Sequence, residues 1–257
     1  MSAAGHNPKG RFSGQADEYA RHRPSYPDEA VRAVIAKAGL ERGAILVDVG
    51  CGTGISSRLF AERGMSVIGV EPNAAMRRRA EATPCPAGPP PRYRDGAAEA
   101  TGVPDAVAQC VVAAQAFHWF DAGAALREFH RILKPGGWVA LLWYERDESD
   151  EFTEAFGNVI RSAPDAAAIE AARIKAGDVL AAQPLFGDYD RRKFRHASWL
   201  DIGGLKGRAF TASYAPNDDA GRAAWATGLD ALHERFQIDG LVRVCYETTL
   251  HMVRRRQ

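Results

Sequence analysis

Residues 45–54, Ile-Leu-Val-Asp-Val-Gly-Cys-Gly-Thr-Gly, decide the fold of this chain. The stretch opens on branched aliphatic residues without helical spacing, which predicts a buried parallel strand. The glycines at positions 50, 52 and 54 let the backbone turn tightly and approach a ligand, because no Cβ stands in the way. Residues 56–62 are predicted to continue as a helix. A strand, a glycine loop and a helix in succession predict the nucleotide-binding corner of a doubly wound α/β sheet.

The glycine spacing and the next strand narrow the choice of ligand. A dinucleotide fingerprint reads G-x-G-x-x-G/A, whereas this loop reads G-x-G-x-G and continues with Ile55. Residues 66–70 predict a second buried strand, and Glu71 follows at its carboxyl end. A carboxylate at that position can accept hydrogen bonds from ribose hydroxyls. The loop alone is a weak signal, but the loop followed by this acid is a strong one.

Residues 48–54 and 70–73 resemble the first motif and the acidic second motif of the class I S-adenosylmethionine-dependent methyltransferases. The resemblance implies a Rossmann-like, doubly wound sheet of seven strands, with the last strand, over 242–253, antiparallel beside the fifth. It also implies a helical N-terminal lid and a helical cap insertion. The implied cofactor is S-adenosylmethionine, which becomes S-adenosylhomocysteine. Because a sulfonium already activates its methyl group, we expect direct in-line transfer to an O, N or C atom of a small-molecule acceptor.

Two later segments resemble the same family. Residues 95–99, Asp-Gly-Ala-Ala-Glu, match the loop that flanks the adenine in the family, where small side chains allow a flat base to approach. Residues 109–114 predict a buried strand, and residues 115–121, Gln-Ala-Phe-His-Trp-Phe-Asp, follow at its carboxyl end. Ligands bind at such strand ends in doubly wound sheets. This segment is similar to a small-molecule branch related to the ubiquinone-biosynthesis and trans-aconitate methyltransferases.

These resemblances divide the candidate site residues into two groups. The expected cofactor-binding residues are Asp48, Gly50, Cys51, Gly52, Gly54, Glu71, Pro72, Ala97, Ala98, Glu99, Gln115 and Ala116. The expected acceptor-side residues are Tyr19, Arg23, Tyr26, Phe117, His118, Trp119 and Tyr214. For the lid tyrosines, Arg23 and Tyr214, simple packing is the alternative role. Asp48 is expected to hold either the loop or the amino group of the cofactor.

His118 is the candidate catalytic residue. If the acceptor is a hydroxyl, a general base such as His118 would assist the transfer. If the acceptor is a carboxylate, no base is needed and His118 only lines the pocket. The sequence offers no obvious acid–base pair, which favours a carboxylate or an already activated nucleophile.

Composition limits the other function classes. The 257 residues are 46% hydrophobic, enough for a sizeable core, and a formal net charge of +1 gives no argument for nucleic acid or for an anionic membrane. The polar N-terminus shows no signal peptide or membrane span. The cysteines lack metal-ligand spacing, so no metal is expected and a reducing cytoplasm is the simplest location. They are Cys51, Cys85, Cys110 and Cys245.

A single domain is expected to cover residues 1–257, as a monomer or a homodimer. Within it, residues 1–30 are assigned to an N-terminal tail and lid, and residues 31–144 to the cofactor-binding core. Residues 145–190 are assigned to a helical cap, and residues 191–257 to strands and helices that complete the sheet.

Four alternative functions stay open at this point. A nucleotide-dependent oxidoreductase shares the strand–loop–helix corner, but the glycine spacing disfavours it. A nucleic-acid methyltransferase is disfavoured by the near-zero charge and by the lack of an Asp/Asn-Pro-Pro-Tyr-like segment after the fourth strand. A non-catalytic cofactor-binding partner protein and a cyclase on the same fold also remain, because a fold does not fix a function.

Overall fold

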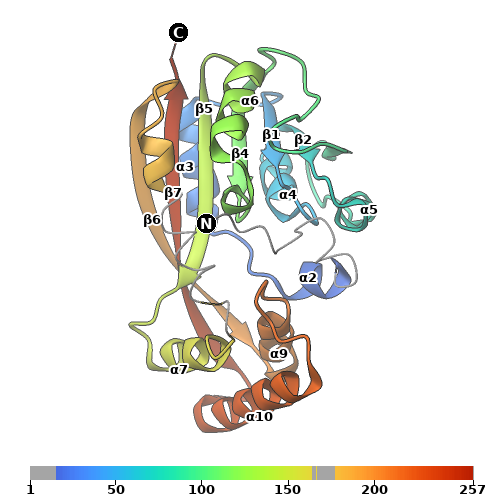
Figure 1. The fold of residues 1–257 in the computed structure, drawn as a ribbon, viewed down its shortest axis with the longest axis vertical. Helices are drawn as coiled ribbons and strands as arrows, with labels where there is room; N and C mark the ends of the chain where they lie inside the picture. Colours follow the sequence, from blue (N-terminus) through green and yellow to red (C-terminus); the bar gives the residue numbers. More distant parts are fainter. Residues whose placement is uncertain (1–15, 164–165, 167–176, 257) are drawn as a thin grey trace.

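The computed structural model describes residues 16–163, 166 and 177–256, and a seven-stranded sheet forms its centre (Figure 1). The strand order is β3-β2-β1-β4-β5-β7-β6, in which neighbouring strands among β1 to β5 are parallel and β7 is antiparallel to both β5 and β6. The strands are β1 (Ile45–Val49), β2 (Ser66–Val70), β3 (Arg92–Arg94), β4 (Ala108–Ala114), β5 (Leu133–Arg146), β6 (Phe186–Leu200) and β7 (Val242–Arg255). The predicted doubly wound sheet with an antiparallel last strand is therefore confirmed.

Successive side chains of the central strands belong alternately to two hydrophobic cores, one on each face of the sheet. Leu46 of β1 belongs to the core beneath α3 (Asp28–Ala38) and α4 (Ile55–Glu62). Its neighbour Val47 belongs to the core beneath α6 (Ala122–Ile132). Because successive residues of a strand point to opposite faces, a run that is apolar at every position is buried on both sides.

The first sheet-covering helix, α3, begins at Asp28 without a side-chain cap. Aspartate is a common N-cap residue, but here Pro27 occupies that position and Asp28 is the first helical residue. The Asp28 carboxylate instead pairs with Arg63 and Arg32, so its side chain points away from the helix start. Gly39 ends α3, with a φ of 60° in the left-handed region that favours glycine.

A group of helices lies beyond one end of the sheet (Figure 1, bottom). We call α7 (Glu151–Ile160), α9 (Ile202–Phe210) and α10 (Asp219–Phe236) the cap helices. Residues 191–257 were assigned to strands and helices that complete the sheet, and within this range α10 packs against α7 and α9. Trp225 of α10 is buried there, and its Nε1 donates to Ser162 Oγ at 3.0 Å. Of the predicted cap at 145–190, residues 164–165 and 167–176 lie outside the described part of the chain.

Three further elements complete the described fold. They are α2 (Ala16–His22), α5 (Ala74–Ala82) and the short 3-10 helix η1 (Phe117–Trp119). Helix α2 contacts both α5 and α9, so it connects the sheet domain with the cap helices. Asn73 caps α5, because its side-chain oxygen accepts from the amides of Ala75 and Met76.

One buried histidine on β7 predicts a pH-dependent stability. Burial, reinforced by Arg191, lowers the pKa of His251 to about 4, whereas an unperturbed histidine side chain has a pKa of 6.5. Between these values the unfolded chain binds a proton that the folded chain does not, so stability falls as the pH is lowered from about 6.5 to about 4. We expect this residue to contribute about 3 kcal/mol of that loss, at about 1.36 kcal/mol for each pH unit.

The His251→Gln variant tests this expectation. Tyr189 Oη lies 2.8 Å from His251 Nδ1, and glutamine can keep a hydrogen bond to that hydroxyl. Urea unfolding of both proteins at several pH values should show a smaller loss of stability for the variant between pH 6.5 and pH 4. Parallel curves for the two proteins would show that His251 does not titrate as described.

Candidate active site

The glycine loop lies at the carboxyl ends of β1 and β2 and is pinned there by backbone hydrogen bonds. Gly50 N and Cys51 N both donate to Val70 O, at 2.8 and 3.2 Å, and Gly54 N donates to Cys51 O at 2.9 Å. Gly50, Gly52 and Gly54 all have positive φ values, of 69°, 56° and 78°. This conformation is one that glycine adopts readily and other residues rarely do. The sequence therefore folds into a tight loop between the two strand ends.

The Asp48 carboxylate holds the two ends of this loop together through hydrogen bonds to the start of α4. Its Oδ2 accepts hydrogen bonds from Ser56 Oγ at 2.7 Å and from Ser57 Oγ at 2.6 Å, which ties the start of α4 to β1. Burial raises the pKa of this carboxyl group, and the two serine hydroxyls oppose that rise. Of the two roles expected for Asp48, these contacts support the one in which it holds the loop.

Glu71 joins the end of β2 to the glycine loop. Its Oε2 accepts from Gly52 N at 2.9 Å and its Oε1 accepts from Asn73 N at 2.8 Å. The residue is only 8% exposed, and burial raises the pKa of its carboxyl group, against the effect of the two amides and of Arg77. Each carboxylate oxygen has a second lone pair, so the group can still accept hydrogen bonds from a ligand.

Glu71 lies on the wall of a cavity of about 160 Å³, which we call the Glu71 cavity. Its lining residues are Gly50, Gly52, Glu71, Pro72, Asn73, Met76, Ala97, Ala98, Glu99, Gln115, Ala116, Trp119 and Phe120. Nine of the residues predicted to bind the cofactor line this cavity. Asn73, Met76 and Phe120 were not predicted, although Asn73 lies in the acidic motif and Phe120 in the segment over 115–121.

A smaller cavity, the loop cavity, lies on the other side of the glycine loop. It is lined by Arg23, Pro24, Tyr26, Gly50, Cys51, Gly52, Thr53, Ile55, Ser56, Ala114, Gln115 and Tyr144. Gly50, Gly52 and Gln115 line both this cavity and the Glu71 cavity, so the two adjoin. Gln115 has a φ of 56°, uncommon for a residue other than glycine. Its Nε2 donates to Tyr144 O at 2.8 Å, which fixes the side chain between the ends of β4 and β5.

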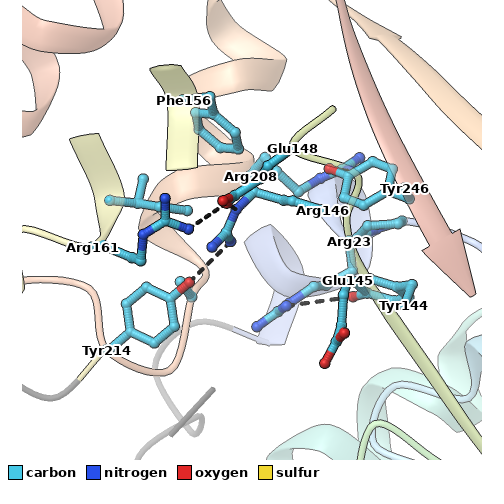
Figure 2. Close-up of a pocket in the computed structure, with 13 residues that line it drawn as sticks. Arg23, Tyr144, Glu145, Arg146, Glu148, Phe156, Arg161, Arg208, Tyr214 and Tyr246 are labelled. Carbon is cyan, nitrogen blue, oxygen red and sulfur yellow. Dashed lines mark hydrogen bonds and ion pairs between the residues drawn. The ribbon is translucent and has the colours of Figure 1, made fainter. Parts of the chain in front are cut away.

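A third cavity, of about 220 Å³, lies between the end of β5 and the cap helices (Figure 2). We call it the arginine cavity, because Arg23, Arg146, Arg161 and Arg208 line it. The other lining residues are Pro24, Tyr144, Glu145, Glu148, Phe156, Ile160, Ala212, Tyr214 and Tyr246. It shares Arg23, Pro24 and Tyr144 with the loop cavity. The three cavities therefore form a continuous series along the carboxyl edge of the sheet.

Comparison with known proteins identifies the domain that carries this edge. Residues 47–141 match the family model described as a methyltransferase domain. The matched segment begins at the first motif and ends in the fifth strand, so it includes the walls of the Glu71 cavity. The predicted resemblance to the class I S-adenosylmethionine-dependent methyltransferases is confirmed.

Relatives and solved structures agree with this assignment. An uncharacterised methyltransferase of Mycobacterium tuberculosis is 34% identical over 149 residues, which cover 58% of this chain and 58% of the relative. The malonyl-[acyl-carrier protein] O-methyltransferase of Pseudescherichia vulneris is 30% identical over 130 residues, 50% of each chain. The chain thus spans between half and three-fifths of these relatives. The structure of a putative type II methyltransferase from Anaeromyxobacter dehalogenans is 25% identical, with a TM-score of 0.68 over 90% of this chain and 97% of that one.

Four of the predicted site residues are not brought to the three cavities of this methyltransferase domain and its cap. Asp48 and Gly54 support the loop from outside the cavities, and Gly54 packs against Tyr93. Phe117 is buried in the core beneath α6, where its ring contacts Phe120. The ring of His118 lies against Trp119, with centroids 4.8 Å apart. The side chain of Tyr19, in α2, lies outside the described part of the chain.

The 3-10 geometry of η1 explains why the side chains of Phe117, His118 and Trp119 point in different directions. Such a helix has three residues per turn, so three successive side chains point in three different directions. Phe117 points into the core, and Trp119 reaches the wall of the Glu71 cavity. His118 is among neither the residues of that core nor those that line the Glu71 cavity. The expectation that all three residues face the acceptor is therefore wrong for Phe117.

Replacing His118 with phenylalanine tests its role as a base. A general base typically contributes about 10²–10⁴-fold to the rate. Because His118 is not among the described residues that line the three cavities, we expect His118→Phe to change kcat by less than about tenfold, a smaller effect than a base would have. A larger fall in kcat, with unchanged affinity for S-adenosylhomocysteine, would show that His118 takes part in catalysis.

Most of the arginines that line the arginine cavity were not predicted from the sequence. Arg23 and Tyr214 were expected on the acceptor side, and both line the arginine cavity, while Tyr26 lines the loop cavity. Arg146, Arg161 and Arg208 carry no motif. They come from the end of β5, the end of α7 and from α9, and only the fold brings them together.

The described part of the chain shows neither a cluster of metal ligands nor a membrane-spanning helix. Among these residues, no three histidine, cysteine, aspartate or glutamate side chains are grouped so that they could hold a metal ion. No described helix is both long enough and apolar enough to cross a membrane. The Cys51 thiol lines the loop cavity, but burial raises its pKa well above the usual value, which keeps it protonated and weakly nucleophilic.

Proposed function

We propose that this protein transfers a methyl group from S-adenosylmethionine to an oxygen atom of a small-molecule acceptor. The series of three adjoining cavities is the observation that carries the proposal. The Glu71 cavity offers a site for the nucleoside, the loop cavity for the sulfur-bearing part, and the arginine cavity for the acceptor. The named activity of the Pseudescherichia vulneris relative, an O-methyltransferase, supports oxygen as the methylated atom.

The residues of the Glu71 cavity fit the adenosine part of this cofactor. The Glu71 carboxylate is buried and already fixed by two backbone amides, so it is preorganised to accept hydrogen bonds from two ribose hydroxyls. Met76, Trp119 and Phe120 supply apolar walls for a flat base. Ala97 and Ala98 are small enough to let such a base approach their backbone.

The loop cavity fits the remainder of the cofactor. Gly50 and Gly52 present backbone without a Cβ, and Ser56 and Thr53 supply polar atoms beside them. When bound, S-adenosylmethionine supplies a sulfonium-activated methyl group, and the electron pair of the broken C–S bond stays on sulfur as the acceptor oxygen forms the new bond to carbon. A hydroxyl acceptor would also release its proton to water, whereas a carboxylate acceptor carries no proton to lose.

The chain's own contribution to such a reaction is orientation. Gln115, held by its bond to Tyr144 O, and the pinned glycine loop form fixed walls between the first two cavities. Arg23 and Tyr144 form the boundary between the second and third cavities, with Arg23 Nη1 donating to Tyr144 Oη at 3.4 Å. Holding two reactants in the correct geometry can remove roughly 7–11 kcal/mol from a barrier. This requires no covalent enzyme intermediate.

An assay with methyl-labelled S-adenosylmethionine tests the proposal. The purified protein is incubated with panels of small acids, phenols and amines, and transfer of label is followed by mass spectrometry. We expect label on an oxygen atom of at least one acid or phenol, together with stoichiometric S-adenosylhomocysteine. Label found only on nitrogen or carbon would contradict the choice of oxygen. Tight cofactor binding without transfer to any acceptor would favour a non-catalytic binding protein.

A further inference from the structure

We propose that the arginine cavity binds the acceptor through an anionic oxyacid group, a carboxylate or a phosphate, with Arg208 and Arg161 as its main donors. The inference rests on the proposed function, because it assigns the acceptor to this cavity. It adds the chemical class of the acceptor: a small acid with an apolar, planar body. Figure 2 shows the arginines converging on the cavity from separate segments of the chain.

Arg208 carries the first part of the argument. Its Nε donates to His22 O, and its Nη1 donates to Tyr246 Oη at 2.5 Å. Its guanidinium carbon also lies 5.6 Å from the centroid of the Tyr246 ring. All of these partners are neutral, and within the described residues no carboxylate pairs with Arg208. These contacts hold a positively charged group in position without neutralising it.

The charges around Arg161 carry the second part. Glu148 Oε1 accepts from Arg146 Nε at 3.3 Å and also from Arg161 Nη1, so two guanidinium groups share one carboxylate. The other acid of the lining, Glu145, is exposed to solvent. The described lining thus contains four arginines and two glutamates, of which one glutamate is at the exposed rim. This excess of positive charge favours an anion, and the planar fork of arginine matches carboxylate and phosphate oxygens.

The neutral walls define the rest of the acceptor. Phe156 and Ile160 of α7 and the rings of Tyr144, Tyr214 and Tyr246 make much of the lining apolar. Tyr214 Oη accepts from Arg146 Nη1 at 3.2 Å, which leaves the ring face beside the guanidinium. A planar acid can therefore pack its body against these rings while its anionic group meets the arginines. The shared Arg23 and Tyr144 mark the side on which the acceptor meets the loop cavity.

Three probes that share a benzene ring distinguish recognition of a negative charge from recognition of the ring. Benzoate carries a carboxylate, phenyl phosphate carries a phosphate and benzamide is neutral. Binding of each probe to the full-length protein is measured by calorimetry, with and without saturating S-adenosylhomocysteine. We expect benzoate, phenyl phosphate or both to bind at least tenfold more tightly than benzamide. The better of the two anions identifies which oxyacid the cavity takes.

Arginine variants locate the binding site. Arg208→Gln and Arg161→Gln should each weaken the preferred anion at least tenfold, while benzamide binding and S-adenosylhomocysteine binding stay within about twofold. Arg235→Gln is the matched control, because Arg235 lies on the outside of α10, where it pairs with Glu151. It should leave the anion affinity unchanged. If Arg208→Gln is shown by circular dichroism to be unfolded, the milder Arg161→Gln variant decides the test.

The outcomes distinguish this inference from the proposed function. Equal affinities for benzamide and the anions, no binding of any probe, or unchanged anion binding in the folded arginine variants would each overturn the inference. S-adenosylhomocysteine binding is recorded in the same titrations, so loss of the cofactor claim and loss of the acceptor claim are seen separately.

Discussion

Glu71→Gln is expected to weaken the binding of S-adenosylhomocysteine by about 10- to 100-fold, which corresponds to about 1.4–2.8 kcal/mol. The substitution keeps the shape of the side chain but replaces a charged acceptor with a neutral one. Hydrogen bonds to a charged group are worth about 1.5–3 kcal/mol, more than those to a neutral group. The NH2 of the glutamine cannot accept a hydrogen bond, so one of the two backbone donors, Gly52 N or Asn73 N, loses its partner.

Calorimetric titration of both proteins with S-adenosylhomocysteine measures this effect. Glu81→Gln is the matched control, because Glu81 is an exposed residue near the end of α5 and lines none of the three cavities. The control should bind like the parent protein. Equal affinity of Glu71→Gln and the control would show that Glu71 does not contact the ligand.

Gly50→Ala is expected to reduce the free energy of unfolding by about 2–5 kcal/mol and to abolish measurable cofactor binding. A left-handed backbone costs about 1–2 kcal/mol for a residue other than glycine. In addition, a Cβ at Gly50 would lie 2.7 Å from Ala116 Cβ and 3.1 Å from Phe120 Cζ. Ala116 Cβ is fixed to the backbone and cannot swing away, so the loop itself must shift, and overpacking of this kind typically costs about 1–3 kcal/mol.

Gly39→Ala separates the conformational cost from the steric one. Gly39 also has a positive φ, of 60°, but a Cβ there would have nothing within 4 Å. Its substitution should therefore cost only about 1–2 kcal/mol, the conformational part, and should leave the cofactor affinity unchanged. Urea unfolding compares the two variants. If both lose the same stability and both still bind S-adenosylhomocysteine, the close packing of the loop against the segment after β4 is not what the site needs.

The sheet and the first cavity could be predicted because their signals are local. A parallel strand buried on both faces reads as a nearly continuous apolar run, as at 45–49, which only Asp48 interrupts, and at 110–114. Glycines at close spacing mark a loop whose conformation few other residues adopt. Glu71 follows its strand directly, so the parallel arrangement of β1 and β2 alone brings it to the loop. Each of these features depends on short-range chemistry and on one topological rule.

The arginine cavity could not be predicted, because its parts share no local signal. Arg146, Arg161 and Arg208 come from three elements that touch only in the folded chain. An isolated arginine in a sequence is usually a solvated surface residue. The position of the cap helices could not be predicted either, because an apolar helix face indicates that a helix packs but does not indicate that α10 packs against α7 and α9.

Phe117 and His118 show a limit of a different kind. The segment over 115–121 was placed correctly at the carboxyl end of β4, because strand ends follow from the apolar run. The directions of its side chains depend on a single 3-10 turn, whose geometry is set by local hydrogen bonds from Trp119 N to Ala116 O and from Phe120 N to Phe117 O. A motif position therefore indicated proximity to the site but not orientation.

Calorimetric titration of the purified protein with S-adenosylhomocysteine, S-adenosylmethionine and NAD tests the central claim most directly. The cavity geometry around the glycine loop and Glu71 predicts micromolar binding of both sulfur ligands and no heat from NAD. Folded protein that binds neither sulfur ligand would contradict the account, and binding of NAD in their place would return the glycine loop to the dinucleotide class.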